Sequence, residues 1–163
     1  LCLIPMVAKE LKIPVIAAGG IGTGRGMYAA LSLGADAVQI GSRFVASEES
    51  SAHQAFKETV VEISEGATQL TLKELAPVRL VKNKFYQDVA EAYANCATKE
   101  DLIKVLGRAR AKKGMFEGDL EEGELEIGQI SGLINEIKPA MEILNEILDE
   151  FKAVQSEMSA FKL

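Results

Sequence analysis

Two short apolar runs, each stopped by a pair of small residues, constrain the fold of this chain more than any other feature. Ile13–Ala18 ends at Gly19-Gly20, and Ala35–Ile40 ends at Gly41-Ser42. The first run contains β-branched residues and no charge, as expected of a strand buried on both faces. The two strand ends lie 21 positions apart, which suits a strand–helix–strand unit with a right-handed crossover. The sequence therefore predicts a parallel α/β architecture.

Apolar residues with helical spacing lie on either side of these runs. Residues 3–11 carry the pattern of one helical face, and residues 24–33 predict a second helix that ends at Gly34. A third helix is expected from about residue 50 to residue 64. This alternation of helices with strands is typical of βαβ units.

The pattern changes after Gly66. Residues 68–89 mix β-branched and basic side chains, and residues 98–113 predict a helix with Thr98 as its N-cap and Gly114 after its end. Glycine recurs every four or five residues over 114–128, which predicts a loop.

A final helix is expected from Pro139 onward. Its apolar residues form three columns, wider than a coiled-coil seam, so the helix either packs on its own domain or contributes to a homodimer interface. The columns are Ala140, Ile147, Val154 and Phe161; Leu144, Phe151 and Met158; and Met141 and Leu148.

Composition excludes several classes of protein. With 163 residues, 48% of them apolar, the chain is large enough for one folded domain, and it has no apolar run near the roughly 20 residues of a membrane span. Leu1–Val7 lacks the features of a signal peptide, and Leu1 is not expected to be a natural start. Cys2 and Cys96 are too few for a disulfide framework, so both are expected to be reduced in a cytoplasmic protein. The net charge of −6 is concentrated after residue 116, which argues against a nucleic-acid partner.

Glycine-rich loops at strand ends are suited to phosphate. Without a Cβ, successive backbone N–H groups can approach a phosphate closely, and in barrels the last two strand–helix loops often form such a site. Gly22–Gly26 is not a proper dinucleotide fingerprint, and no Walker lysine and hydroxyl follow it. The alternative is that both loops are merely tight turns.

The sequence resembles the nitronate monooxygenase (2-nitropropane dioxygenase) family, including its FMN-dependent enoyl-acyl-carrier-protein reductase II branch. The likeness begins with the two strand units, which resemble the last two of an FMN-binding (β/α)8 barrel, and continues through motifs in a family-specific order over nearly the whole chain. The segments are Pro14–Ile21, Ala30–Phe44, Glu49–His53, Pro77–Arg79 with Lys82-Asn83, Gly128–Ile134 and Ile137–Pro139.

This resemblance implies a TIM-barrel part at 1–66, a small lid or substrate domain at 67–134 and a C-terminal helix at 135–163. Backbone groups at the two glycine loops would hold the FMN phosphate, and Gln39 would line the pocket at the end of the last strand. Ser42 stands where family members commonly have Thr. The implied cofactor-binding residues are Gly19, Gly20, Gln39, Ile40, Gly41 and Ser42.

The same resemblance implies that other parts of the site lie elsewhere. The family's catalytic histidine belongs to a glycine-rich segment before the stretch that matches Leu1, so no catalytic residue is assigned in this chain. A (β/α)8 barrel takes at least about 200 residues, and only two of its strands are found here. The chain is therefore interpreted as the C-terminal half of a longer enzyme.

Three functions follow as hypotheses. The first is oxidation of a nitronate by oxygen to a carbonyl compound and nitrite, with FMN as the redox cofactor. The alternative is reduction of an enoyl thioester, with NADH or NADPH as electron donor and acyl carrier protein as a partner. The third is a non-catalytic interaction fragment built around the C-terminal helix.

Other candidate residues favour structural roles. His53, the only histidine, is expected to start or pack a helix, and Arg43 is either a support for the phosphate loop or part of an ion pair. The basic residues near 79–84 are interpreted as a solvated edge rather than a phosphate-attracting patch: Arg79, Lys82 and Lys84. An acidic run lacks the spacing of a calcium loop and is interpreted as solvated, so no metal site is expected: Asp119, Glu121, Glu122 and Glu124.

Overall fold

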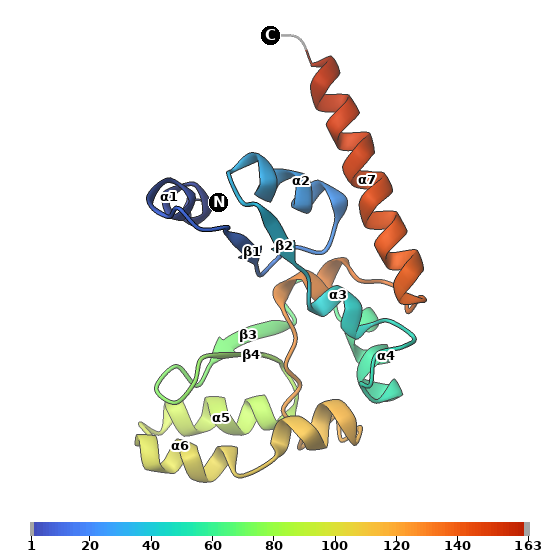
Figure 1. The fold of residues 1–163 in the computed structure, drawn as a ribbon. Helices are drawn as coiled ribbons and strands as arrows, with labels where there is room; N and C mark the ends of the chain where they lie inside the picture. Colours follow the sequence, from blue (N-terminus) through green and yellow to red (C-terminus); the bar gives the residue numbers. More distant parts are fainter. Residues whose placement is uncertain (1, 162–163) are drawn as a thin grey trace. The chain divides into compact units, whose positions relative to one another are not determined.

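The structure, a computed structural model, describes residues 2–161. It divides into two compact units, one formed by residues up to Glu49 together with those from Lys138 on, and the other by Ser50–Ile137. Unit 1 contains the predicted strands and the final helix. Figure 1 shows the elements of both units along the chain.

Unit 1 contains a parallel strand–helix–strand core, as the sequence predicts. Ala18 and Gln39, the last residues of the two strands, are partners in the register. The strands are shorter than the apolar runs that predicted them, at three residues each. The elements are α1 (Leu3–Glu10), β1 (Ile16–Ala18), α2 (Gly24–Ser32), β2 (Ala37–Gln39), α3 (Ser42–Val45) and α7 (Ala140–Ala160).

The expectation that the first strand is buried on both faces is wrong. Ala17 packs against Ala30 and Ala35, whereas Ile16 is 61% exposed and Ala18 is also exposed. Ala30 of α2 and Ile4 of α1 pack on the side of the sheet that Ala17 faces, whereas the side chain of Ile16 is left largely open within residues 2–161.

Helix α2 begins and ends where the sequence predicts. The side chain of Thr23 caps its start by accepting a hydrogen bond from Gly26 N–H at 3.0 Å. After its end Gly34 adopts a φ of +101°, a left-handed conformation that favours glycine.

Helix α7 lies along α2, as Figure 1 shows. The face that α7 buries consists of Ile143, Ile147 and Val154. Ile143 falls outside the three predicted columns, while Met141, Met158 and Phe161, which fall within them, are exposed. The columns were drawn from apolarity alone, whereas the partner helix α2 selects the face that is buried.

Unit 2 pairs an antiparallel hairpin with helices (Figure 1). In the hairpin Thr68 pairs with Val81 and Thr71 with Val78. Leu72, Leu80 and Phe85 belong to a core that also takes residues from α5 and α6. The elements are α4 (Gln54–Glu62), β3 (Thr68–Thr71), β4 (Val78–Val81), α5 (Lys84–Ala94), α6 (Lys99–Leu106), a π-helical turn (Lys112–Phe116) and a 3-10 turn (Gln129–Leu133).

Several predicted boundaries in this unit need correction. Thr98 is the N-cap of α6, as predicted, but the helix ends at Leu106, before Gly107 with its φ of +65°, and not at Lys113. The predicted helix at 50–64 covers only Gln54–Glu62, because His53 caps its start. Helices α3 and α5 were not predicted.

The glycine-rich stretch at 114–128 is not only loop. Val81 N–H donates to Leu125 O at 3.0 Å and Ile127 N–H donates to Arg79 O at 3.2 Å. Leu125 and Ile127 are buried, so this stretch extends along β4 and contributes to the core. The frequent glycines obscured a short extended segment.

The two compact units divide at Ser50 and Lys138, while the domain boundaries expected at 66 and 134 stay a prediction. Helix α4 belongs to the second unit, where it contacts the two irregular turns. No helix within the described residues is long and apolar enough to cross a membrane.

Candidate functional site

The two glycine loops leave the sheet at the same edge. Strands β1 and β2 are parallel neighbours, and their last residues, Ala18 and Gln39, are paired. The residues that follow each strand therefore begin next to each other, at the carboxyl edge where α/β sheets bind ligands. The structure thus brings the predicted cofactor-binding residues to one place: Gly19, Gly20, Gln39, Ile40, Gly41 and Ser42.

The backbone of these loops is open. Gly19 and Gly20 have φ values of +97° and +71°, so a side chain at either position would strain the backbone. An ideal Cβ placed on Gly19, Gly20 or Gly41 meets no other atom within 4 Å. A ligand can therefore reach the main chain at all three positions, which suits recognition of phosphate oxygens by backbone N–H groups.

The remaining predicted residues differ in exposure. Gln39 is exposed, whereas Ile40 and Ser42 are half-buried. Arg43, next to Ser42, has a side chain only 11% exposed and approaches Glu146 of α7 at 3.6 Å. This contact matches the ion-pair interpretation of Arg43.

The start of α2 is not open to a ligand in the same way. Gly24 N–H donates to Glu150 Oε2 at 2.7 Å, and Gly26 N–H donates to Thr23 Oγ1 at 3.0 Å. Two donors of the first turn are therefore already bound by side chains of the chain itself. Glu150 lies 126 positions from Gly24, and no local sequence signal indicates this pairing.

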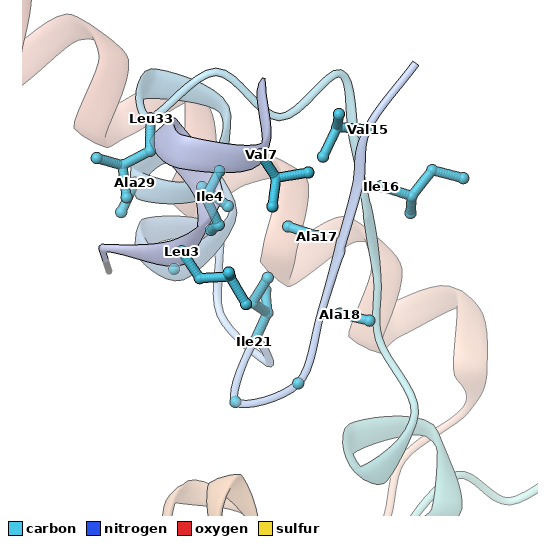
Figure 2. Close-up of a pocket in the computed structure, with 14 residues that line it drawn as sticks. Leu3, Ile4, Val7, Val15, Ile16, Ala17, Ala18, Ile21, Ala29 and Leu33 are labelled. Carbon is cyan, nitrogen blue, oxygen red and sulfur yellow. The ribbon is translucent and has the colours of Figure 1, made fainter. Parts of the chain in front are cut away.

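An apolar cleft of about 480 Å³ runs from α1 along β1 to the Gly19-Gly20 turn. Figure 2 shows Ile4 and Val7 of α1 opposite Ala17 of β1. None of the lining residues is titratable, so the cleft itself offers apolar contacts and no acid–base group. They are Leu3, Ile4, Val7, Val15, Ile16, Ala17, Ala18, Gly19, Gly20, Ile21, Gly26, Ala29, Ala30 and Leu33.

The basic motif of unit 2 is structural and not a simple solvated edge. Arg79 Nη1 donates to the carbonyl and the hydroxyl of Thr68, each at 3.2 Å, and so ties β4 to β3. Lys84 Nζ lies 2.6 Å from Glu122 and 3.1 Å from Asp88, and the hydrogen bond to Glu122 raises the pKa of Lys84. Lys82 is exposed. The expectation of a solvated edge therefore fits Lys82 but is wrong for the half-buried Arg79.

Asn83, beside this motif, connects three parts of unit 2. Its side-chain nitrogen donates to Leu120 O and Gly123 O, both at 2.8 Å, and to Glu121 O at 3.2 Å. Its side-chain oxygen accepts from Tyr86 N–H at 3.0 Å and caps α5. The motif residues Arg79 and Asn83 thus hold the hairpin, α5 and the following loop together.

His53 starts a helix, as predicted. Its Nδ1 accepts a hydrogen bond from Ala55 N–H at 3.2 Å at the N-terminus of α4. Its backbone N–H donates to Met115 O at 2.8 Å. These contacts explain His53 without a catalytic role.

The acidic run is only partly solvated. Asp119 accepts from Glu122 N–H at 2.8 Å, and this bond, with Lys113 nearby, holds the pKa of Asp119 below its ordinary value. Glu124 is 8% exposed, and its burial raises the pKa of its carboxyl, so the expectation that it is solvated is wrong. Within residues 2–161, no three Cys, His, Asp or Glu residues gather in a metal-binding arrangement.

The comparisons with known proteins agree on one family. The model for nitronate monooxygenase matches residues 1–150. A probable nitronate monooxygenase of Bacillus subtilis is 36% identical over 92% of this chain and 43% of its own length. A nitronate monooxygenase of Pseudomonas aeruginosa is 32% identical over 93% of this chain and 43% of its own length.

Two solved structures are also similar to this chain in both fold and sequence. FabK from Thermotoga maritima has a TM-score of 0.91 and 40% identity over 98% of this chain and 51% of its own. A nitroalkane oxidase from Streptomyces ansochromogenes has a TM-score of 0.75 and 30% identity over 96% of this chain and 44% of its own. The chain thus has the α/β fold of these proteins and spans about half the length of the relatives it matches.

Proposed function

Because this chain belongs to the nitronate monooxygenase family, we propose that it supplies the C-terminal half of a flavin-dependent oxidoreductase that oxidises nitronates. The observation that carries the proposal is the pair of open glycine loops at the ends of two adjacent parallel strands. The chain contributes the last two strand–helix units of a (β/α)8 barrel, the lid at 67–134 and the closing helix. The enzyme is cytoplasmic in this proposal.

The exposed side of the sheet supports a barrel that continues beyond these two strands. Ile16 is exposed although it lies in a strand, and the apolar cleft of Figure 2 lies between α1 and β1. A sheet edge and an apolar face of this kind are covered in stable proteins. The remaining strands of the barrel would pair with this edge and fill the cleft.

The loop residues fit an FMN phosphate. Its oxygens would meet backbone N–H groups at Gly19-Gly20 and Gly41-Ser42, where an ideal Cβ on any of the three glycines meets nothing within 4 Å beyond its chain neighbours. Gln39, exposed at the end of β2, would line the flavin pocket. When bound, FMN supplies reversible two-electron redox chemistry, while the protein orients the reactants and excludes water.

The proposed reaction converts a nitronate and oxygen to a carbonyl compound and nitrite. In this proposal the side chain that moves the proton comes from another part of the enzyme, as the family resemblance implies, and His53 has the separate task of capping α4. The proposed role of this chain is therefore to bind and orient the cofactor through its two glycine loops.

A second candidate reaction is supported by the likeness to FabK, at 40% identity. In this candidate, NADH or NADPH is the electron donor, the substrate is an enoyl thioester and acyl carrier protein is a partner. Both candidates use the same phosphate loops, so they differ in the substrate and not in the FMN site.

Substrate tests on the complete enzyme separate the two. Nitronate consumption with oxygen uptake and nitrite release is expected. Anaerobic mixing with reduced nicotinamide and an enoyl thioester should give no rapid reduction. The opposite pattern would replace the first candidate with the second.

Flavin binding is tested with two matched glycine variants. Gly20→Val is expected to release most of the FMN, because the new side chain enters the open space beside the loop. Gly66→Val is the control, since Gly66 has a similar φ of +80° and open surroundings but lies in unit 2. Equal FMN occupancy in both variants would contradict the proposed phosphate site.

The third hypothesis, a non-catalytic interaction fragment, makes a different prediction. This chain prepared alone would then be a compact monomer without affinity for FMN.

A further inference from the structure

The phosphate loop is fixed at both of its ends. At its start, Ala18 of β1 is paired with Gln39 of β2. At its exit, Gly24 N–H donates to the carboxylate of Glu150 at 2.7 Å. Between these points Ile21 packs against the core of Ala17, Ala30 and Ala35, whereas Gly19 and Gly20 bring no side chain that could hold the turn itself.

The exit contact is close because Gly24 has no side chain. An ideal Cβ on Gly24 would lie 2.2 Å from Ile147 O and 2.3 Å from Phe151 N, both in the backbone of α7. The ring of Phe151 also lies 5.6 Å from the ring of Tyr28 on α2. The first turn of α2 therefore rests directly on α7, with the Glu150 carboxylate at the junction.

We propose that Glu150 is a positioning residue for the flavin-phosphate loop, acting from α7 through the backbone N–H of Gly24. This inference rests on the proposed function. Its physical basis is that a hydrogen bond to a carboxylate is stronger than one between neutral groups. By fixing the exit of a glycine-rich loop, it reduces the conformational freedom that the loop would lose on binding a phosphate.

The bond between Glu150 and Gly24 also directs the phosphate to the two glycine loops rather than to the start of α2. Glu150 and Thr23 occupy the N–H groups of Gly24 and Gly26. The negative charge of Glu150 also offsets the partial positive charge of the helix N-terminus. The start of α2 is thereby held as a support and not as a phosphate ligand.

The test uses three variants of α7 in the complete enzyme. Glu150→Ala removes the bond to Gly24, and Glu150→Gln keeps an oxygen that can accept it. Val154→Ala is the control for stability, because Val154 is buried in α7 but has no polar contact with the loop.

Two measurements are made on each variant. The first is the dissociation constant of FMN, and the second is hydrogen exchange of residues 19–24 in the flavin-free enzyme. Glu150→Ala is expected to raise the dissociation constant at least about fivefold and to speed exchange over residues 19–24. Glu150→Gln should restore most of both properties, and Val154→Ala should lower the melting temperature while leaving both close to wild type.

The inference would be overturned if Glu150→Ala bound FMN as tightly as wild type, or if Val154→Ala weakened binding equally. The second result would mean that α7 matters only for stability. A wild-type enzyme without affinity for FMN would overturn the proposed function, and with it this inference. The two failures are distinguishable because only the latter affects the wild type.

Discussion

Replacing Asn83 tests whether the motif around it holds unit 2 together. Asn83→Ala removes the donor shared by the carbonyls of Leu120, Glu121 and Gly123, and the acceptor that caps α5 at Tyr86 N–H. The variant should therefore loosen the junction between these segments.

The expected loss in the free energy of unfolding is the sum of two contributions. Removing an N-cap oxygen costs about 1 kcal/mol. Leaving part-buried carbonyls without their donor costs about 1–3 kcal/mol more. Asn83→Ala should thus lower the free energy of unfolding by about 2–4 kcal/mol. Asn83→Ser keeps a capping hydroxyl but loses the amide donors, so it should recover about 1 kcal/mol of this loss.

The assay is urea unfolding of the complete enzyme followed by far-ultraviolet circular dichroism, with hydrogen exchange of α5 as the local measurement. Faster exchange at the start of α5 is expected for Asn83→Ala and less so for Asn83→Ser. A loss below about 0.5 kcal/mol for Asn83→Ala, the range of ordinary surface substitutions, would refute the reasoning. Equal losses for both variants would refute the capping contribution.

Three further predictions concern packing and pH. Gly24→Ala should destabilise the protein by about 3 kcal/mol or more, because its Cβ would meet backbone of α7 at 2.2 Å. Gly26→Ala, whose Cβ meets a hydroxyl at 3.3 Å, should change stability by less than about 1 kcal/mol in thermal unfolding, because the helix propensity of alanine offsets this contact. Hydrogen bonding with Thr98 lowers the pKa of Asp101 from 3.8 to about 2. Its stabilising contribution is therefore present above pH 3.8 and lost as pH falls to 2, so the stability difference from Asp101→Asn should vanish there. Burial raises the pKa of Glu124 above 4.5, so Glu124→Gln should be more stable than wild type at pH 7, and unfolding at falling pH should show this advantage shrinking toward 4.5.

The features that the sequence predicted correctly depend on neighbouring residues. The strand–helix–strand unit follows from short apolar runs and helical spacing within about 30 residues. Thr98 as an N-cap follows from the capping box that it forms with Asp101 three positions later. Gly34 follows from the need for a left-handed residue after α2. Each of these signals is local, so one sequence is enough to detect it.

The features that were missed depend on residues far apart. The extended segment at 125–127 forms because Leu125 O and Ile127 N–H bond to β4, more than 40 positions earlier. Helix α6 ends at Leu106, where Gly107 follows with a φ of +65°, although apolar and basic residues continue to Lys113. Arg110 then donates to Glu122 O at 2.7 Å, twelve positions later in the chain. The spacing of apolar residues along the sequence does not reveal β4 as the partner of residues 125–127, nor Glu122 as the partner of Arg110.

The glycines of residues 19–24 explain why a motif search gives little information about this loop. Gly19 and Gly20 provide left-handed backbone and open space for a ligand, whereas Gly24 is required by the backbone of α7 and is closed to any ligand. A pattern counts these glycines alike, although only the first two face the candidate site. Because Glu150 occupies the start of α2, the open backbone is that of Gly19, Gly20 and Gly41 on the two loops. This arrangement fits a single phosphate, as in a mononucleotide, better than the pyrophosphate of a dinucleotide, which binds at a helix N-terminus.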